Sequence, residues 1–104
     1  MSDRQLQPHD IRQGADEKIA RSVTVTSWGT TPTDVTVKTY DLSGATPTDV
    51  SATVHTGAPS VAGDVITTPL IGGLVAGRAY RVEIKFTASN GNTFEPFFII
   101  AAEA

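Results

Sequence analysis

The sequence predicts an all-β fold, which we expect to be a β-sandwich of about seven short strands. Three observations support this prediction. Fifteen threonines and nine glycines favour strands and turns over helices. Several segments alternate apolar with polar residues, which is the period of a strand with one buried face. The run Leu74–Tyr80 has the Leu-x-x-Gly-x-x-Tyr spacing that is typical of a tyrosine corner in Greek-key β-sandwiches.

The corner is the most specific of these signals. In such a corner, a tyrosine near the start of a central strand bonds back to the chain a few residues upstream. Gly77 tolerates the positive φ that a sharp corner requires, because it has no Cβ. We therefore expect Leu74, Gly77 and Tyr80 to stabilise the fold and to carry no chemistry.

Alternation and turn residues delimit six strand segments. They are residues 19–27, 35–42, 50–55, 61–71, 80–89 and 93–102. Valine alternates with polar residues in the first two segments, and the third pattern is weaker. Pro69 interrupts the fourth segment, and proline removes a donor from the ladder, so this segment is expected to be an edge strand or a bulged strand.

The segment 80–89 has the cleanest alternation in the chain. One face carries Tyr80, Val82, Ile84 and Phe86, and the other carries Arg81, Glu83, Lys85 and Thr87. Asn90 and Gly91 then predict a two-residue type I′ turn, which needs positive φ at both positions. In that register, the cross-strand partners are Phe86 with Glu95, Ile84 with Phe97, and Val82 with Ile99.

The last segment is apolar at successive positions, so it has no polar face. In the register above, Phe97 and Ile99 face the core, while Phe94, Phe98 and Ile100 lie on the opposite face. A slip or bulge of one residue exchanges the two sets, because side chains alternate along a strand. Either the N-terminal residues or a loop cover the outer set, or another subunit does. We expect the outer set to be a protein interface.

Residues 1–18 are polar and are expected to be an N-terminal arm ahead of one folded domain over residues 19–104. Pro8 and Gly14 interrupt any helix, and Leu6 and Ile11 are the apolar positions within the charged part of the arm. Two interpretations stay open. The arm is a disordered leader, or it becomes ordered on a neighbouring subunit with Leu6 and Ile11 as interface anchors.

Charge and composition exclude several classes of partner. Eight basic and eleven acidic residues give a formal charge of −3, and the basic residues are scattered, so no nucleic-acid partner is expected. The chain has no cysteine, which excludes disulfides and thiolate metal sites. No apolar run has the length of a membrane helix, and no secretory signal is visible, so no membrane partner is expected.

Residue patterns that carry chemistry are missing from the sequence. His9 and His55 lack a ligand partner at metal spacing, so no metal site is expected. No Gly-x-Ser-x-Gly elbow supports a serine hydrolase, and no phosphate-binding glycine loop is present, so we expect no enzyme activity and no cofactor. The aspartates at strand ends, Asp34, Asp41, Asp49 and Asp64, are expected to cap turns rather than to bind calcium.

Residues 61–102 resemble small immunoglobulin-like proteins encoded in tailed-phage structural gene clusters, of the fibre-tail adaptor type. Three stretches carry the resemblance: a Gly-Gly corner followed by Gly-x-x-Tyr-x-Val at residues 71–82, a Thr/Ser-rich strand end with glycine at residues 86–91, and a glutamate before an apolar strand at residues 94–100. The Leu-x-x-Gly-x-x-Tyr part is also similar to fibronectin type III modules. The resemblance implies an immunoglobulin-like or fibronectin type III-like sandwich.

The resemblance also implies a non-enzymatic phage virion protein, made in the bacterial host cytoplasm and working as a homo-oligomer. The expected role is a neck or tail adaptor that joins other virion proteins through its apolar last strand and its N-terminal arm. A capsid decoration protein on the phage head is the first alternative. An adhesive or carbohydrate-binding module is the second alternative, for which Trp28 and Tyr40 are the candidate aromatic contacts.

Overall fold

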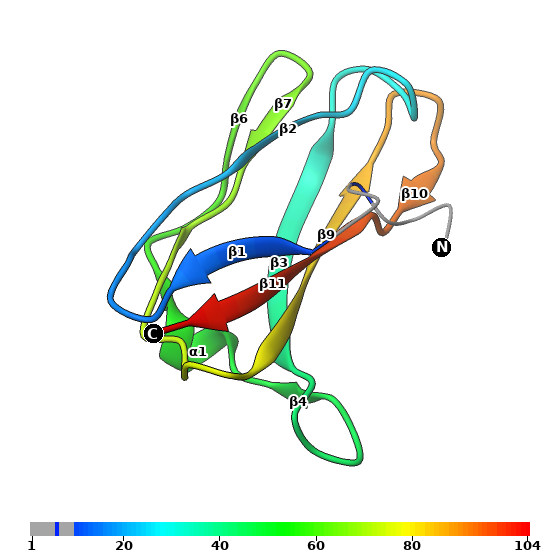
Figure 1. The fold of residues 1–104 in the computed structure, drawn as a ribbon. Helices are drawn as coiled ribbons and strands as arrows, with labels where there is room; N and C mark the ends of the chain where they lie inside the picture. Colours follow the sequence, from blue (N-terminus) through cyan, green and yellow to red (C-terminus); the bar gives the residue numbers. More distant parts are fainter. Residues whose placement is uncertain (1–5, 7–9) are drawn as a thin grey trace.

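The main sheet of this computed structural model, which describes Leu6 and residues 10–104, is built around one long central strand (Figure 1). That strand, β9 (Ala79–Thr87), pairs antiparallel with β3 (Thr33–Asp41) on one side. On the other side it pairs with β10 (Thr93–Phe94) and β11 (Phe97–Glu103). The short strand β4 (Thr48–Asp49) extends the sheet beyond β3, and β1 (Ile11–Gly14) extends it beyond β11. Because β1 runs parallel to β11, the sheet is mixed.

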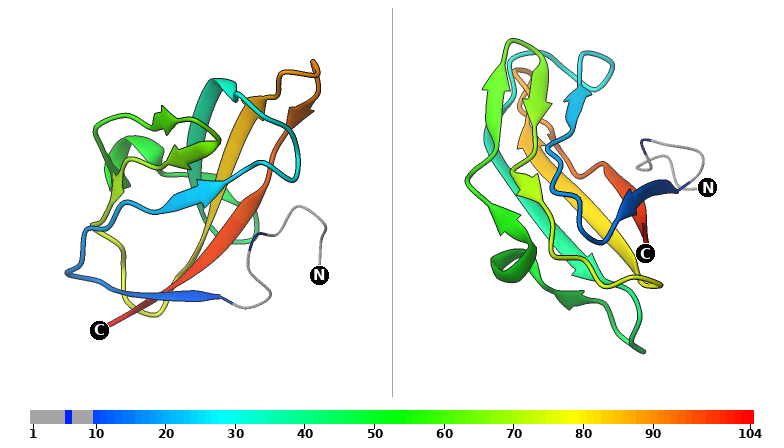
Figure 2. Two further views of the ribbon diagram at one scale, coloured as in Figure 1. Left: turned by 90° about the horizontal axis from the view of Figure 1, so that it is seen from above. Right: turned by 60° about the vertical axis from the view of Figure 1, so that its left-hand side comes forward.

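Two smaller antiparallel sheets lie over one face of the main sheet (Figure 2). One has the order β2 (Ser22–Thr24), β7 (Val65–Thr67), β6 (Ser60–Ala62), and the other pairs β5 (His55–Thr56) with β8 (Leu70–Ile71). The described residues contain one short helix, α1 (Ser51–Val54). No helix in this part of the chain has the length and apolar character needed to cross a membrane.

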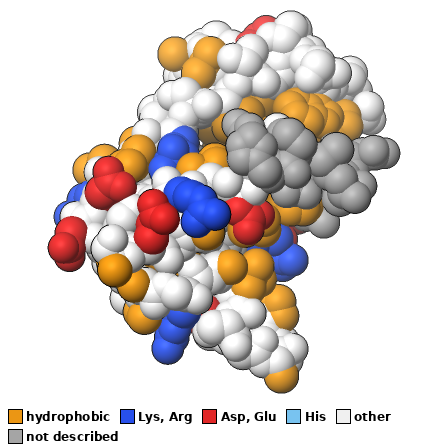
Figure 3. All heavy atoms as spheres, viewed as in Figure 1, with side chains coloured by type: hydrophobic (Ala, Val, Ile, Leu, Met, Phe, Trp, Pro, Cys, Tyr) orange, Lys and Arg blue, Asp and Glu red, His pale blue; other side chains and the backbone are white. Residues whose placement is uncertain are grey.

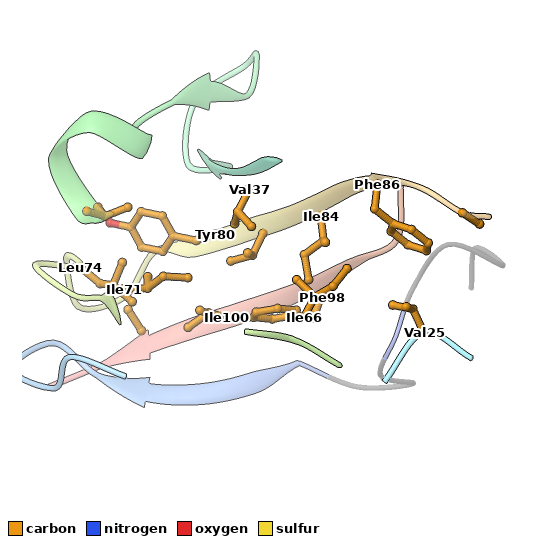
Figure 4. Packing of buried hydrophobic residues seen from close by; sticks show 14 residues of the cluster. Val25, Val37, Ile66, Ile71, Leu74, Tyr80, Ile84, Phe86, Phe98 and Ile100 are labelled. Atoms are coloured by element: carbon orange, nitrogen blue, oxygen red, sulfur yellow. The ribbon is translucent and has the colours of Figure 1, made fainter. Parts of the chain in front are cut away.

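The core fills the space between the main sheet and the smaller sheets. Its most deeply buried apolar side chains are Val25, Ile66, Ile71, Tyr80, Val82, Ile84, Phe86, Phe98 and Ile100. In Figure 4, Ile84 of β9 and Phe98 of β11 point toward Ile66 of β7. Polar groups are also buried at the inward positions Gln13, Thr39 and Asp41. The mostly-β fold predicted from alternation is confirmed, and the inward face of β9 is the predicted one.

The predicted register of the C-terminal hairpin is wrong by one residue. Phe94 lies opposite Phe86, and Phe98 lies opposite Val82. The turn is a three-residue loop: the Ala88 N–H donates to the Asn92 carbonyl at 2.8 Å, and the Gly91 N–H donates to the Ala88 carbonyl at 2.9 Å. Gly91 has a φ of +87°, whereas Asn90 is not in the left-handed region, so the loop is a tight turn followed by one left-handed residue rather than a type I′ turn.

The predicted strand over residues 50–55 is instead helix α1 followed by β5. Val50 and Val54 stand four residues apart, a spacing that fits one face of a helical turn as well as a strand. The Val54 N–H donates to the Val50 carbonyl at 3.1 Å, and the Asp49 carboxylate accepts the Ser51 N–H at 2.9 Å. Local hydrogen bonds of this kind favour a turn over a strand.

Part of the predicted N-terminal arm pairs with the main sheet. Residues 11–14, which lie within the arm expected over residues 1–18, form β1 beside β11. Residues 61–71, expected as one strand interrupted at Pro69, form β6, a turn at Gly63 and Asp64, β7 and then β8. Pro69 does separate β7 from β8, as its missing N–H predicts.

Candidate functional site

The candidate site is the face of the main sheet that points away from β2, β6 and β7. Alternation along the strands places three sets of side chains on this outward face. They are Thr36, Lys38 and Tyr40 of β3, Arg81, Glu83 and Lys85 of β9, and Phe97 and Ile99 of β11. The inward neighbours of these residues are core, so the pleat of the sheet holds the outward set in fixed register.

Charged and aromatic groups on this face contact one another. Arg81 Nε lies 2.9 Å from Glu83 Oε2, an ion pair in which Nε makes no hydrogen bond because the contact is poorly aligned. The Arg81 guanidinium carbon also lies 5.3 Å from the centre of the Tyr40 ring, which is a cation–π distance. The side chains of Arg81 and Glu83 are only 30% and 16% exposed. These charges are therefore already partly desolvated.

A shallow groove of about 290 Å³ runs along the β3 and β9 part of the face. Its lining residues are Thr36, Lys38, Tyr40, Glu83, Lys85 and Glu95. Two lysines and two glutamates balance in charge, and one aromatic ring adds a flat apolar surface. Such a lining suits a polar partner with groups of both signs, and it offers no nucleophile beside a base.

An apolar row on β11 borders this charged area. Phe97 lies opposite Glu83, and Ile99 lies opposite Arg81, so both residues share the outward face with the ion pair. Both side chains are half-buried. Figure 3, which looks onto the β1 edge of the sheet, shows hydrophobic and charged side chains intermixed on that side of the molecule. The face therefore combines an apolar row with charges that are held in place, the composition of an interface core with a polar rim.

The structure corrects the expected orientation of the last strand. Phe98 and Ile100, predicted on the outward face, are 2% and 0% exposed and belong to the core. Phe94, also predicted outward, lies opposite Phe86 and packs against it with ring centres 5.7 Å apart. The three-residue loop causes this exchange. The residues that face outward are instead Phe97 and Ile99. This is the set expected when the predicted register is shifted by one residue.

The predicted arm anchors contact the same chain. The Leu6 N–H donates to the Phe97 carbonyl at 2.7 Å. Ile11 lies opposite Ile100 in the parallel pairing of β1 with β11. Both side chains pack against the hydrophobic core. Contacts of Leu6 and Ile11 with a neighbouring subunit stay a prediction.

The three corner residues lie together before β9. The Val75 N–H donates to Tyr80 Oη at 2.9 Å, which is the backward hydrogen bond that the spacing predicts. Gly77 has a φ of +87°, and Leu74 is buried. An ion pair of 2.8 Å between Arg78 Nη1 and Asp41 Oδ2 ties the corner to the end of β3. Hydrogen bonds from Ser43, and then the contact with Arg78, lower the pKa of Asp41.

A polar network links β3, β4 and α1 without forming a catalytic triad. Ser51 Oγ donates to Asp49 Oδ1 at 2.6 Å and accepts the Thr39 N–H at 2.9 Å. His55 Nε2 bonds to Thr39 Oγ1 at 2.7 Å, so the histidine contacts a buried threonine rather than the Ser51 hydroxyl. Burial lowers the pKa of His55, and the charge of Asp49 opposes that shift. Bonds from Ser51 lower the pKa of Asp49.

The remaining candidates have structural contacts as well. Asp64 accepts Thr26 Oγ1 and the Thr31 N–H, both at 3.0 Å, and so joins the β6–β7 turn to the loop after β2. Trp28 is half-buried against the core. Among the described residues, no three histidine, aspartate or glutamate side chains gather as a metal ion would require. His9 lies outside the described residues.

Two residues that the sequence analysis did not single out form a buried polar contact. Gln13 is fully buried, and its Nε2 donates to the Ile71 carbonyl at 2.8 Å. Arg21 Nη2 donates to Gln13 Oε1 at 3.2 Å. The available signal was the position of Arg21, which takes an inward place in the alternation of residues 19–25.

No protein-family model matches this chain, and no curated protein matches it either.

Proposed function

We propose that this protein is a non-enzymatic structural component of a tailed-phage virion, a multimeric adaptor in the neck or tail. We further propose that its fold is an immunoglobulin-like or fibronectin type III-like β-sandwich. Three findings support the fold proposal: the smaller sheets cover one face of the main sheet, Tyr80 bonds back to Val75, and residues 61–102 resemble phage immunoglobulin-like proteins.

The outward row of Phe97 and Ile99 is the observation that carries the functional proposal. Full burial of an exposed side chain of this size contributes about 1.5–3 kcal/mol, and covering the half-buried Phe97 and Ile99 would contribute a part of that. Arg81 and Glu83 are already partly desolvated and held together, so a partner surface would lose less free energy on covering them. A symmetric assembly repeats such a contact in every subunit, and modest contacts then suffice for a stable ring.

The test is quantitative mass spectrometry of purified particles from a strain that carries the gene. A copy number that matches a single ring supports the neck or tail adaptor. A copy number near that of the major capsid protein favours capsid decoration instead. Absence from the particle overturns the virion proposal.

One substitution on the outward face and one control substitution on β5 sharpen that test. Phe97→Asp places a charge in the outward row, and we expect a folded protein that is lost from particles. Thr56→Asp, on an exposed position of β5, is the matched control and should be incorporated normally. Equal incorporation of both variants contradicts the role of the outward face.

The groove beside Tyr40 favours one further candidate, a carbohydrate-binding or adhesive module. Sugars bind to an aromatic ring flanked by polar side chains, and the groove has this lining. A glycan array that gives hits with the native protein and none with Tyr40→Ala would support this candidate. An array without hits, together with incorporation into particles, would remove it.

A further inference from the structure

A second surface lies at the free edge of β2, which is the end strand of the sheet β2-β7-β6. Within residues 19–25, every second residue makes backbone hydrogen bonds to the rest of the layer that contains β2. Ile19 and Ile71 exchange two N–H···O bonds of 3.0 and 3.1 Å, and the Arg21 carbonyl accepts the Thr68 N–H at 2.9 Å. The Val25 N–H donates to the Asp64 carbonyl at 2.8 Å. The backbone groups of these odd-numbered residues are therefore already hydrogen-bonded within the chain.

The residues between them point their backbone groups the other way. In an antiparallel ladder, successive residues direct N–H and C=O to opposite sides of the strand. Ala20, Ser22 and Thr24 therefore present three N–H and three C=O groups to the free edge, and all three residues are exposed. An unpaired row of this kind is a template for the backbone of another strand.

This edge borders a groove of about 320 Å³ between the two layers, with a lining that is partly apolar and partly polar. The apolar lining residues are Leu6, Ile11, Ile19, Ala20, Val23 and Phe98. The volume equals that of roughly ten water molecules in the liquid, which is enough for side chains from an added strand. Figure 2 shows β2 and β1 as neighbouring edges of the two layers.

Arg21 gives the groove a charge preference. Its side chain lines the groove, and Nη2 bonds to Gln13, but the buried Nε has no hydrogen-bond partner within the described residues. Arg21 is half-buried, and the charge of Glu17 acts on it within the chain. A further carboxylate is the group that such a guanidinium binds most strongly.

The described N-terminal residues of the chain do not occupy this edge. Leu6 donates its N–H to the Phe97 carbonyl, and β1 pairs with β11, so both belong to the main sheet. They form the floor of the groove and leave the β2 edge open.

We propose that this groove binds an extended segment of another protein, which adds to β2 as an extra strand. The segment has apolar residues at alternate positions, which rest on the groove floor, and a carboxylate that faces Arg21. Main-chain hydrogen bonds supply the affinity in this mode, and the groove supplies the selectivity. The surface is separate from the outward face, so this proposal does not rest on the virion proposal.

The experiment uses the full chain and a capped synthetic hexapeptide of sequence TVTDTV as the probe, in which two valines and the aspartate stand at alternate positions and so face the groove together. Hydrogen exchange followed by NMR should show protection of the Ser22 and Thr24 amides on binding, with no protection at β4 or β6. Ser22→Pro removes an N–H that the fold itself does not use, and we expect binding at least about tenfold weaker. Ser22→Ala keeps that N–H and should bind like the native chain.

Three outcomes of the peptide experiment overturn the proposal. They are absence of binding at millimolar peptide, equal affinity of the Ser22→Pro and Ser22→Ala variants, and protection confined to another surface. Protection of the same amides without peptide, as the protein concentration is raised, identifies a second copy as the occupant and also overturns the assignment to another protein. Circular dichroism of both variants verifies that each one is folded.

Discussion

The two faces of the main sheet are made by the same three long strands but have opposite chemistry. On β9, the inward residues are at most 2% exposed and apolar, while the outward residues include Arg81, Glu83 and Lys85, which are charged. On β11, both faces are apolar, and only exposure separates Phe98 from Phe97. The outward face of β9 therefore carries charged residues, as expected for a surface that meets water, whereas the outward face of β11 carries the half-buried apolar residues Phe97 and Ile99.

The largest expected effect tests this difference on neighbouring residues. Phe98→Asp places a carboxylate in the core and should lower the free energy of unfolding by about 4 kcal/mol or more. Phe97→Asp should lower it by about 1 kcal/mol or less, because that side chain lies on the outward face. Urea denaturation followed by circular dichroism measures both. Similar losses for the two variants would show that the faces are not distinct.

A second pair compares neighbours on β1. Gln13→Ala removes the side-chain bond to the Ile71 carbonyl, which keeps the Ile19 N–H, and it removes the partner of Arg21 Nη2; the loss of these buried bonds should cost about 2 kcal/mol of stability. Arg12→Ala removes an exposed ion pair of 3.5 Å with Glu103 and should have almost no effect. Thermal unfolding midpoints of the two variants give the comparison. A larger loss for Arg12→Ala than for Gln13→Ala would contradict it.

A third pair compares the two tyrosines. Tyr80→Phe removes the bond to the Val75 N–H while it keeps the ring, so stability should fall by about 1 kcal/mol. Tyr40→Phe keeps the ring surface that faces Arg81 and should be neutral in stability. Chemical denaturation resolves a difference of this size. Equal stability of Tyr80→Phe and the native chain would mean that the corner bond contributes nothing.

The smallest effect is the pH dependence due to His55. Burial lowers its pKa in the folded chain, so the unfolded chain binds the proton more readily. The stabilising effect is complete above the ordinary pKa of about 6.5 and is lost as the pH falls from there toward the lower folded-state pKa. His55→Gln should remove this part of the pH dependence. A native curve that stays flat from pH 7 to pH 5, or that is unchanged in the variant, would contradict the expectation.

Alternation predicted those parts of the fold in which one face is polar. β3 and β9 lie where the pattern places them, since most charged residues of a central strand take the solvent-facing positions and apolar residues take the inward ones. The spacing of Leu74, Gly77 and Tyr80 predicted the corner bond, because only local geometry is required for it.

The candidate site was harder to predict from the sequence than the fold, and the physical reason is different for β11, for β1 and for Arg21. The register of β11 depends on one residue in the loop at Gly91. Residues Phe97–Ala102 are all apolar, so a register shifted by one residue would bury no polar side chain, and the sequence does not distinguish the two registers. β1 is held by pairing with a strand at the far end of the chain, so no local pattern marks it. The contact of Arg21 could not be predicted, because its partner Gln13 lies on β1 and reaches it only through the fold.

The parallel pairing of β1 with β11 also imposes an order on folding. Contacts between distant parts of a chain form slowly, because the intervening loop must first be closed. During synthesis, β11 leaves the ribosome after the other described strands, and β1 has no partner in the main sheet until then. The edge of β11 and the floor of the groove can therefore be completed only after residues 97–103 are released, which leaves a period in which chaperones or other nascent chains compete for the same edge.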